Sequence, residues 1–205
     1  MLFDDYINTG MVYHVVDIND LKNVLESGIM YDDKSTYLDK YLSFHKFLDS
    51  FRPDHIPDWV IREKAIFSSL NFSKAHYFHS HSVILGIRID PNRCWIFNEN
   101  LANSLYEHFI LQEIKDFYMA RDYLEVIGKD IGRKYWETSL PFLENLKIRQ
   151  DKKEGYDGEV LIFYSIQPRD ILPLYIVSDH KMMTIEEWKT FFKGESKNGN
   201  RKTSK

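Results

Sequence analysis

Cysteine is nearly absent from this chain, since Cys94 is the one cysteine among 205 residues. A single thiol excludes an internal disulfide framework and is typical of proteins that fold in a reducing cytosol, so we expect a cytoplasmic location. Long apolar runs are also missing, and none approaches the roughly 20 residues that a membrane-spanning helix needs. The first residues lack the basic start and the apolar stretch of a secretory signal. We therefore expect no membrane partner.

Glycine-rich loops and an excess of positive charge are missing as well. No strand-like segment leads into a glycine-rich phosphate loop, so a Rossmann or P-loop nucleotide site has no support. The net charge of -4 argues against a protein that coats nucleic acid generally, although it leaves room for a local basic surface.

Aromatic side chains, by contrast, are abundant: the chain has 13 tyrosines, 14 phenylalanines and 4 tryptophans. These are more rings than a small core needs, so we expect some of them to line a cleft. A chain of this length can bury one sizeable core, which predicts a single domain over residues 1–193. The remaining stretch, 194–205, is too polar to pack, and we expect it to be disordered.

Hydrophobic periodicity outlines the secondary structure. Short β-branched and aromatic segments predict strands at 12–16, 65–69, 83–89, 94–97, 159–165 and 172–177, and we expect the fourth to pair with the third. Periodicities of three to four residues predict helices at 21–28, 36–51, 73–77, 98–126 and 133–146, with the last bent or split at Pro141, and a capping box at Thr184 opens a final helix. Helices gather in the middle and do not alternate with the strands, so we expect an α+β fold rather than a doubly wound one.

His14 is the first candidate site residue. It lies beside Tyr13 on the first strand, where successive residues face opposite ways, so only one of the two points into a given cleft. An imidazole in that position can serve a functional site. The plainer interpretation is a partly buried histidine that bonds a backbone carbonyl.

Glu159 is the second candidate, a carboxylate at the start of a buried strand. A charge in that position is costly unless it faces a polar site or the wet end of the strand. It is therefore either a functional carboxylate or one that is simply solvated at the rim. A strand-borne histidine and a strand-opening glutamate can converge only if their strands share a sheet.

The stretch 62–77 carries hydroxyls and rings between these two candidates. Ser68 and Ser69 could bind a ribose or an amide, and the alternative is a strand end that caps the next helix. The rings that could stack on a flat ligand, or lie in the core instead, are those of Phe67, Phe72 and Tyr77.

In their order, these pieces resemble the His-Tyr-Glu branch of the ADP-ribosyltransferase superfamily, which includes diphtheria toxin, the poly(ADP-ribose) polymerases and DarT-like toxins. The matching residues are Tyr13-His14 before a helix that ends at Gly28, Phe67-Ser-Ser69 with Ala75-His-Tyr77, and Glu159 before Ile166-Gln-Pro-Arg-Asp-Ile171. Phe67 stands where the pattern has a tyrosine, which is a departure at the stacking position.

The resemblance implies a fold and an activity. The fold would be a split β-sheet core with a helical insertion at 98–147. The activity would be transfer of ADP-ribose from NAD, the substrate, to a macromolecular acceptor, either protein or nucleic acid. Such an enzyme would be a toxin or a phage-defence effector, for which an antitoxin protein is a natural partner.

The resemblance also implies residue roles. Glu159 would stabilise the oxocarbenium-like state that forms when the nicotinamide–ribose bond breaks, and His14 would hold the ribose. The loop 150–158, with Tyr156, would recognise the acceptor. The other residues expected to contact NAD are Tyr13, Val15, Arg62, Phe67, Ser69 and Tyr77, with Arg62 on the pyrophosphate.

Two rival functions stay open. The first is a non-catalytic protein-interaction domain on the same fold, which the departure at Phe67 and the helical insertion favour. The second is a metallohydrolase, because clustered imidazoles can bind a transition metal. The residues concerned are His76, His79, His81 and Asp90. They lack an evident supporting shell, so we expect a polar connector and no metal there.

Overall fold

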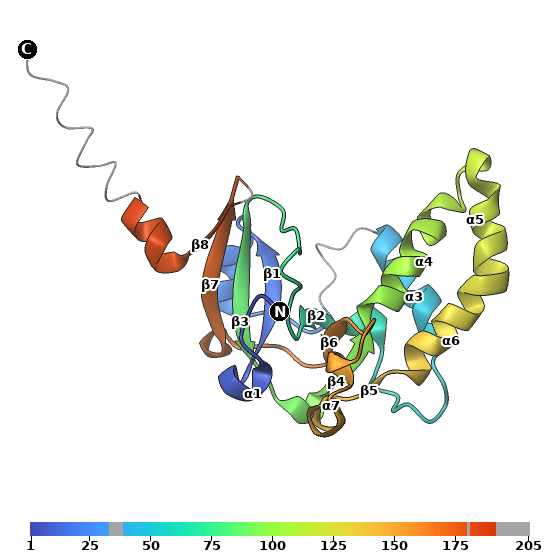
Figure 1. The fold of residues 1–205 in the computed structure, drawn as a ribbon, viewed down its shortest axis with the longest axis horizontal. Coiled ribbons are helices and arrows are strands. Elements are labelled where there is room, and N and C mark those ends of the chain that lie inside the picture. The colour runs from blue at the N-terminus through green and yellow to red at the C-terminus, as the bar shows by residue number, and fades with distance from the viewer. Residues whose placement is uncertain (33–38, 180, 192–205) are drawn as a thin grey trace, which may run out of the picture.

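The computed structural model describes residues 1–32, 39–179 and 181–191, so the expected tail 194–205 lies outside the described residues. The strands are β1 (Met11–Asp17), β2 (Ile66–Ser69), β3 (Ser82–Arg88), β4 (Cys94–Asn98), β5 (Leu140–Pro141), β6 (Gly158–Ile162), β7 (Ile171–Ser178) and β8 (Lys181–Thr184). They form one antiparallel sheet in the order β5-β4-β6-β2-β1-β3-β7-β8 (Figure 1). The expected α+β class is confirmed.

The helices lie at both ends of this sheet. They are α1 (Tyr6–Thr9), α2 (Leu21–Ser27), α3 (Asp39–Asp49), α4 (Glu99–Leu111), α5 (Tyr118–Tyr123), α6 (Lys129–Glu137) and α7 (Phe142–Ile148), with a further helix at 185–191. Figure 1 shows α3, α4, α5 and α6 on the side of β2, β6 and β4, away from β7 and β8. Within the described residues, no helix is long and apolar enough to cross a bilayer.

The sheet has two halves that meet at one point. β1 is paired with β3 along its whole length, from Met11 to Asp17, but its pairing with β2 consists of one position, Tyr13 opposite Ser69. β2 in turn runs along β6 over all four of its residues. The two halves therefore diverge on either side of the Tyr13–Ser69 pair, and space opens between β1 and β2.

The helical segment between β4 and β6 is part of the core. Tyr135 and Trp136 of α6 are fully buried with Phe97 of β4, and the Trp136 indole N–H donates to the Leu48 carbonyl of α3 at 2.7 Å. Truncating a buried ring of this size costs roughly 3–5 kcal/mol. Residues 98–147 thus stabilise the half of the sheet that carries β4 and β6.

Three secondary-structure predictions are wrong. The helix expected at 98–126 is interrupted after Leu111 and resumes at Tyr118 as α5. The segment 94–97 does not pair with 83–89, because β3 already has β1 on one edge and β7 on the other, and β4 pairs with β5 and β6 instead. The segment 73–77 is a turn and not a helix. It is too short to be helical alone, and the ring of His76 packs between those of Phe72 and Phe78.

Candidate functional site

A cavity of about 340 Å³ lies where β1 and β2 diverge. The residues that line it are Tyr13, His14, Val15, Phe67, Ser68, Ser69, Phe72, Glu99 and Glu159. Both predicted catalytic residues are among them, together with most of the residues expected to contact NAD. Arg62 and Tyr77 are not: Arg62 is buried, and Tyr77 is 64% exposed.

Ser69 connects the two predicted catalytic strands. It lies opposite Tyr13 of β1 on one side and opposite Glu159 of β6 on the other. Directly opposed residues in an antiparallel sheet point to the same face, so Tyr13, Ser69 and Glu159 share a face. The expectation that the histidine strand and the glutamate strand belong to one sheet is confirmed.

Glu159 is buried and fully bonded. It is 5% exposed, which excludes a carboxylate solvated at the rim. Its Oε1 accepts from Nη2 of Arg62 at 3.0 Å, and its Oε2 accepts from Nη1 of Arg62 at 2.5 Å and from the Tyr135 hydroxyl at 3.0 Å. A two-pronged guanidinium contact of this kind fixes both the charge and the orientation of a carboxylate.

Arg62 lies behind Glu159 and uses its donors within the protein. Besides Glu159, it donates from Nη1 to the Tyr135 hydroxyl and from Nε to Nδ1 of His45, and its guanidinium lies 4.8 Å from the centre of the Phe67 ring. Burial alone would lower the pKa of Arg62, but the charge of Glu159 and its hydrogen bond, together with Tyr135 and Asp49, outweigh burial and raise the pKa. The structure therefore places Arg62 as a buried support for Glu159.

Tyr135 completes this support. Burial raises the pKa of Tyr135 well above its ordinary value, so its hydroxyl keeps the proton that it donates to Glu159. No pattern in the sequence distinguishes Tyr135 from the other aromatic residues of a buried helix, and the same holds for His45. Their proximity to Glu159 depends on how α3 and α6 pack.

His14 bridges the two halves of the sheet. Its Nδ1 lies 2.6 Å from the carbonyl oxygen of Phe67 on β2, next to the single backbone pair between β1 and β2. A carbonyl only accepts, so Nδ1 carries the hydrogen and Nε2 of the neutral ring is an acceptor. Burial lowers the pKa of His14, which favours this neutral form. The plainer interpretation of His14 is thus correct for one nitrogen, and the residue also lines the cavity.

A second hollow, of about 510 Å³, adjoins the first. The two share His14 and Val15 in their linings, and the second continues along α2 with polar side chains that include Asp17, Asp20 and Asn23. Both hollows therefore reach β1 at these two residues, and together they are called the cleft.

Gly28 closes α2 beside this cleft. Its φ is +85°, and a Cβ at this position would lie 2.1 Å from the carbonyl oxygen of Ile166. The neighbouring residue, Ile29, exchanges backbone hydrogen bonds with Ile166 in both directions. Only glycine allows this approach, which ties the helix after β1 to the segment after β6.

Glu99 is a site residue that the sequence analysis missed. It is the first residue of α4, and its backbone N–H donates to the Asp157 carbonyl at 2.9 Å. Burial, followed by the charges of Glu159 and Asp157, raises the pKa of Glu99 to about 7. The pairing of β4 with β6 brings Glu99 to the cavity, and the wrong partner expected for β4 concealed it.

Hydrogen bonds fix the predicted acceptor loop, 150–158, to the rest of the protein at two places. Asn98 accepts from the Asp157 N–H and donates to the Gly155 carbonyl, both at 3.1 Å. Tyr156 is 9% exposed, and its hydroxyl donates to the Thr138 carbonyl. The expectation that Tyr156 reads the acceptor is therefore wrong, because its ring lies in the core.

The histidine cluster shows no metal geometry. Within the described ranges, no group of three or more His, Cys, Asp or Glu side chains is arranged to hold a metal ion. The ring of His76 belongs to the aromatic contacts around Phe72 and Phe78.

The hydroxyl of Ser68 is buried and has no hydrogen-bond partner among the described residues.

Comparisons of this chain with models of protein families, with curated proteins and with solved structures find no match. The residues of the cleft itself therefore provide the basis for a functional proposal.

Proposed function

We propose that this chain is an NAD-dependent ADP-ribosyltransferase on an ADP-ribosyltransferase-like split sheet, and that it modifies a macromolecular acceptor. One observation carries the proposal. His14 and Glu159 line the same cavity at the divergence of β1 and β2, in the order in which the superfamily has its histidine and its glutamate. The two residues are 145 positions apart in the chain, and the fold brings both to the lining of this cavity.

The shape of the cleft supports a dinucleotide. Two adjoining hollows share the wall formed by His14 and Val15, which suits a ligand with two nucleoside halves. In this arrangement the nicotinamide half lies by Glu159, and the adenosine half lies along α2, where Asp17 and Asp20 can accept from ribose hydroxyls. Among the residues that the structure describes, no lysine or arginine lines either hollow, so we assign the pyrophosphate to the open side of the cleft.

The chemistry follows from the charges at the cavity. When the bond between nicotinamide and ribose breaks, positive charge develops on the ribose, and a fixed carboxylate nearby stabilises it. Arg62 and Tyr135 hold Glu159 in one orientation, which avoids reorganisation during the reaction. Nε2 of neutral His14 accepts from a ribose hydroxyl.

Phe67 has a supporting role in this proposal. Its ring lies 4.8 Å from the centre of the His45 ring in a stacked arrangement and 4.8 Å from the Arg62 guanidinium. A ring packed in this way holds the partners of Glu159, and its replacement of the pattern's tyrosine leaves the carboxylate and the histidine in place.

The test is calorimetric titration of NAD combined with an assay of nicotinamide release. We expect the wild type to bind NAD saturably and to release nicotinamide. Glu107→Gln, on the exposed face of α4, should release nicotinamide as the wild type does, and Glu159→Gln should lose the release. His14→Ala should weaken NAD binding. Absence of NAD binding to the wild type, or full release by Glu159→Gln, would contradict the proposal. If the glutamine variant does not fold, Glu159→Asp replaces it in the same assay, because aspartate keeps the charge and shortens the side chain.

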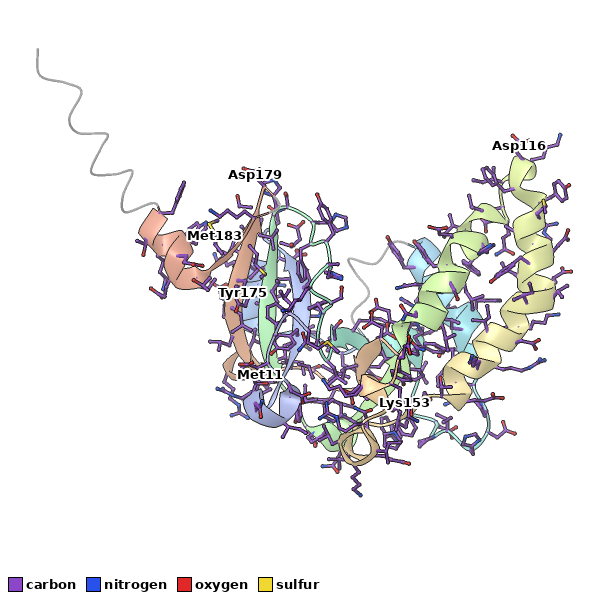
Figure 2. The ribbon with its side chains drawn as sticks, viewed as in Figure 1. Met11, Asp116, Lys153, Tyr175, Asp179 and Met183 are labelled. Carbon is purple, nitrogen blue, oxygen red and sulfur yellow. The ribbon has the colours of Figure 1, made fainter. Side chains whose placement is uncertain are left out.

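A second candidate function is a protein-interaction domain. It is favoured by the end of the α4 and α5 pair that lies farthest from the sheet. Figure 2 labels Asp116 at this end, and the exposed apolar residues nearby include Phe117, Met119 and Val126. A hollow of about 550 Å³ at this end has Asp116 and Asp122 as its acidic edge. The occupant that fits is a partner helix with an apolar face and basic edges. A leucine- and lysine-containing helical peptide should bind, and its glutamate-edged counterpart should not; equal binding of both would contradict this function.

A further inference from the structure

Glu99 occupies a fixed place in the proposed active site. It follows directly after β4, where Asn98 lies opposite Gly158 and Phe97 lies opposite Glu159 in the ladder with β6. The Asn98 side chain accepts from the backbone N–H of Asn100, which fixes the first turn of α4. The carboxylate of Glu99 therefore lines the same cavity as Glu159 from a rigid element.

The two carboxylates of the cavity have different partners. Glu159 is held by both arms of Arg62 and by Tyr135. Glu99 interacts through its side chain with Asn103, and in the part of the chain that the structure describes no lysine or arginine forms an ion pair with it. A carboxylate held by an ion pair suits electrostatic stabilisation, whereas a carboxylate that forms no ion pair can take up a proton.

We propose that Glu99 is the general base of the transfer, an inference that rests on the proposed function. The nitrogen or oxygen of the acceptor's N–H or O–H group attacks the anomeric carbon of the ribose on the face opposite nicotinamide and forms the new bond. The carbon–nitrogen bond to nicotinamide breaks, its electron pair neutralises the pyridinium, and nicotinamide leaves. The acceptor's proton passes to Glu99, from which it goes to solvent, so charge and atoms balance.

The same walls define the acceptor by its chemistry. The described residues that line the cavity are carboxylates and uncharged groups. The guanidinium of Arg62 is already paired with Glu159. An anionic acceptor group would be repelled there, so the nucleophile is a neutral N–H or O–H group. Water and methanol are the simplest members of this class.

The environment of Glu99 places its proton exchange near neutral pH. The charged or titratable groups around it are Glu159 of β6, Asp157 of the loop before β6, and Arg62. His14 lines the same cavity, and Tyr135 donates to Glu159. Burial and the two neighbouring acids raise the pKa of Glu99 to about 7. A base works in its deprotonated form, so the rate should rise as the pH passes upward through this value.

The experiment measures nicotinamide release from NAD between about pH 5 and about pH 9, with water alone and with methanol added. In the wild type and in Glu107→Gln, release should rise around pH 7. In Glu99→Gln it should be lower by about 10²-fold at neutral pH, without that rise, while the binding of NAD by calorimetry stays within a few-fold. Formate should restore part of the rate in Glu99→Ala and leave the wild type unchanged.

The outcomes separate the two proposals. If Glu99→Gln keeps the rate and pH profile of the wild type, Glu99 is not the base, although the ADP-ribosyltransferase proposal stands. If the wild type binds NAD but releases no nicotinamide with either acceptor, a base that activates such acceptors is likewise contradicted. If the wild type neither binds nor cleaves NAD, both proposals fall.

Discussion

Arg62 and Glu159, 97 positions apart in the chain, form a buried ion pair that joins the turn before β2 to the start of β6. Both side chains are almost fully withdrawn from solvent, at 5% and 7% exposure. The pair gives Glu159 a fixed charge next to the cavity, and it links the proposed catalysis to the stability of the fold.

Removal of one member of this pair should be more harmful than removal of both. Arg62→Met leaves the Glu159 charge buried without a partner, and we expect the free energy of unfolding to fall by about 3–5 kcal/mol. Glu159→Met should cost a similar amount, and the double variant should cost less than either single variant. Chemical denaturation measures all three.

The matched control is Arg133→Met, which breaks an exposed pair with Asp130 and should change the stability by less than about 1 kcal/mol. Additive losses at Arg62 and Glu159 would contradict the coupling that the structure indicates.

The main parts of the cleft are predictable because their signals are local. The apolar strand with His14, the helix that ends at Gly28, and the strand that opens with Glu159 each have a pattern within a few residues, and all three are found. Strand order has no such local signal. The predicted pairing of β4 with β3 is wrong because β3 is already paired on both edges.

That error concealed the residues that complete the site. Glu99 reaches the cavity only because β4 lies beside β6, and Arg62, Tyr135 and His45 meet Glu159 only through helix packing. Each of these side chains has an ordinary local context, such as a helix start or an aromatic helix face. Contacts between distant segments depend on tertiary packing, which hydrophobic periodicity does not encode.

Tyr135→Phe should separate positioning from binding. The ring remains, but Glu159 loses one donor and Arg62 loses one acceptor, and we expect a loss of about 1–3 kcal/mol in stability. If Tyr135 positions the carboxylate, kcat for nicotinamide release should fall while KM for NAD changes little. Tyr118→Phe, on the exposed surface of α5, is the control for a lost hydroxyl. A change confined to KM would contradict a positioning role.

Gly28→Ala tests the close approach between α2 and the segment after β6. The added methyl group would need to enter the space of the Ile166 carbonyl oxygen, 2.1 Å away, and the positive φ adds strain. Gly10→Ala is a matched control, because Gly10 also has a positive φ, of +65°, but open space around its Cβ position. We expect Gly10→Ala to cost about 1–2 kcal/mol and Gly28→Ala clearly more, measured by denaturant titration. If both variants lose the same stability, the backbone strain at positive φ accounts for the whole loss, and the clash with the Ile166 carbonyl contributes little.

Glu99→Gln should stabilise the protein in a pH-dependent way, whatever reaction the site performs. The fold raises the pKa of this carboxyl from 4.5 to about 7, chiefly through burial. The unfolded chain therefore releases the proton more readily, so the wild type loses stability as the pH rises from about 4.5 to about 7, and the loss persists above that range. Glutamine has no proton to lose, so the variant should exceed the wild type by roughly 1–2 kcal/mol at about pH 8 and match it at about pH 4, after allowance for partial solvent screening. Glu107→Gln, on the solvent side of the same helix, should show no such difference. A Glu99→Gln advantage that is equal at both pH values would mean that its carboxyl titrates normally, and that burial at the cavity does not hold its proton.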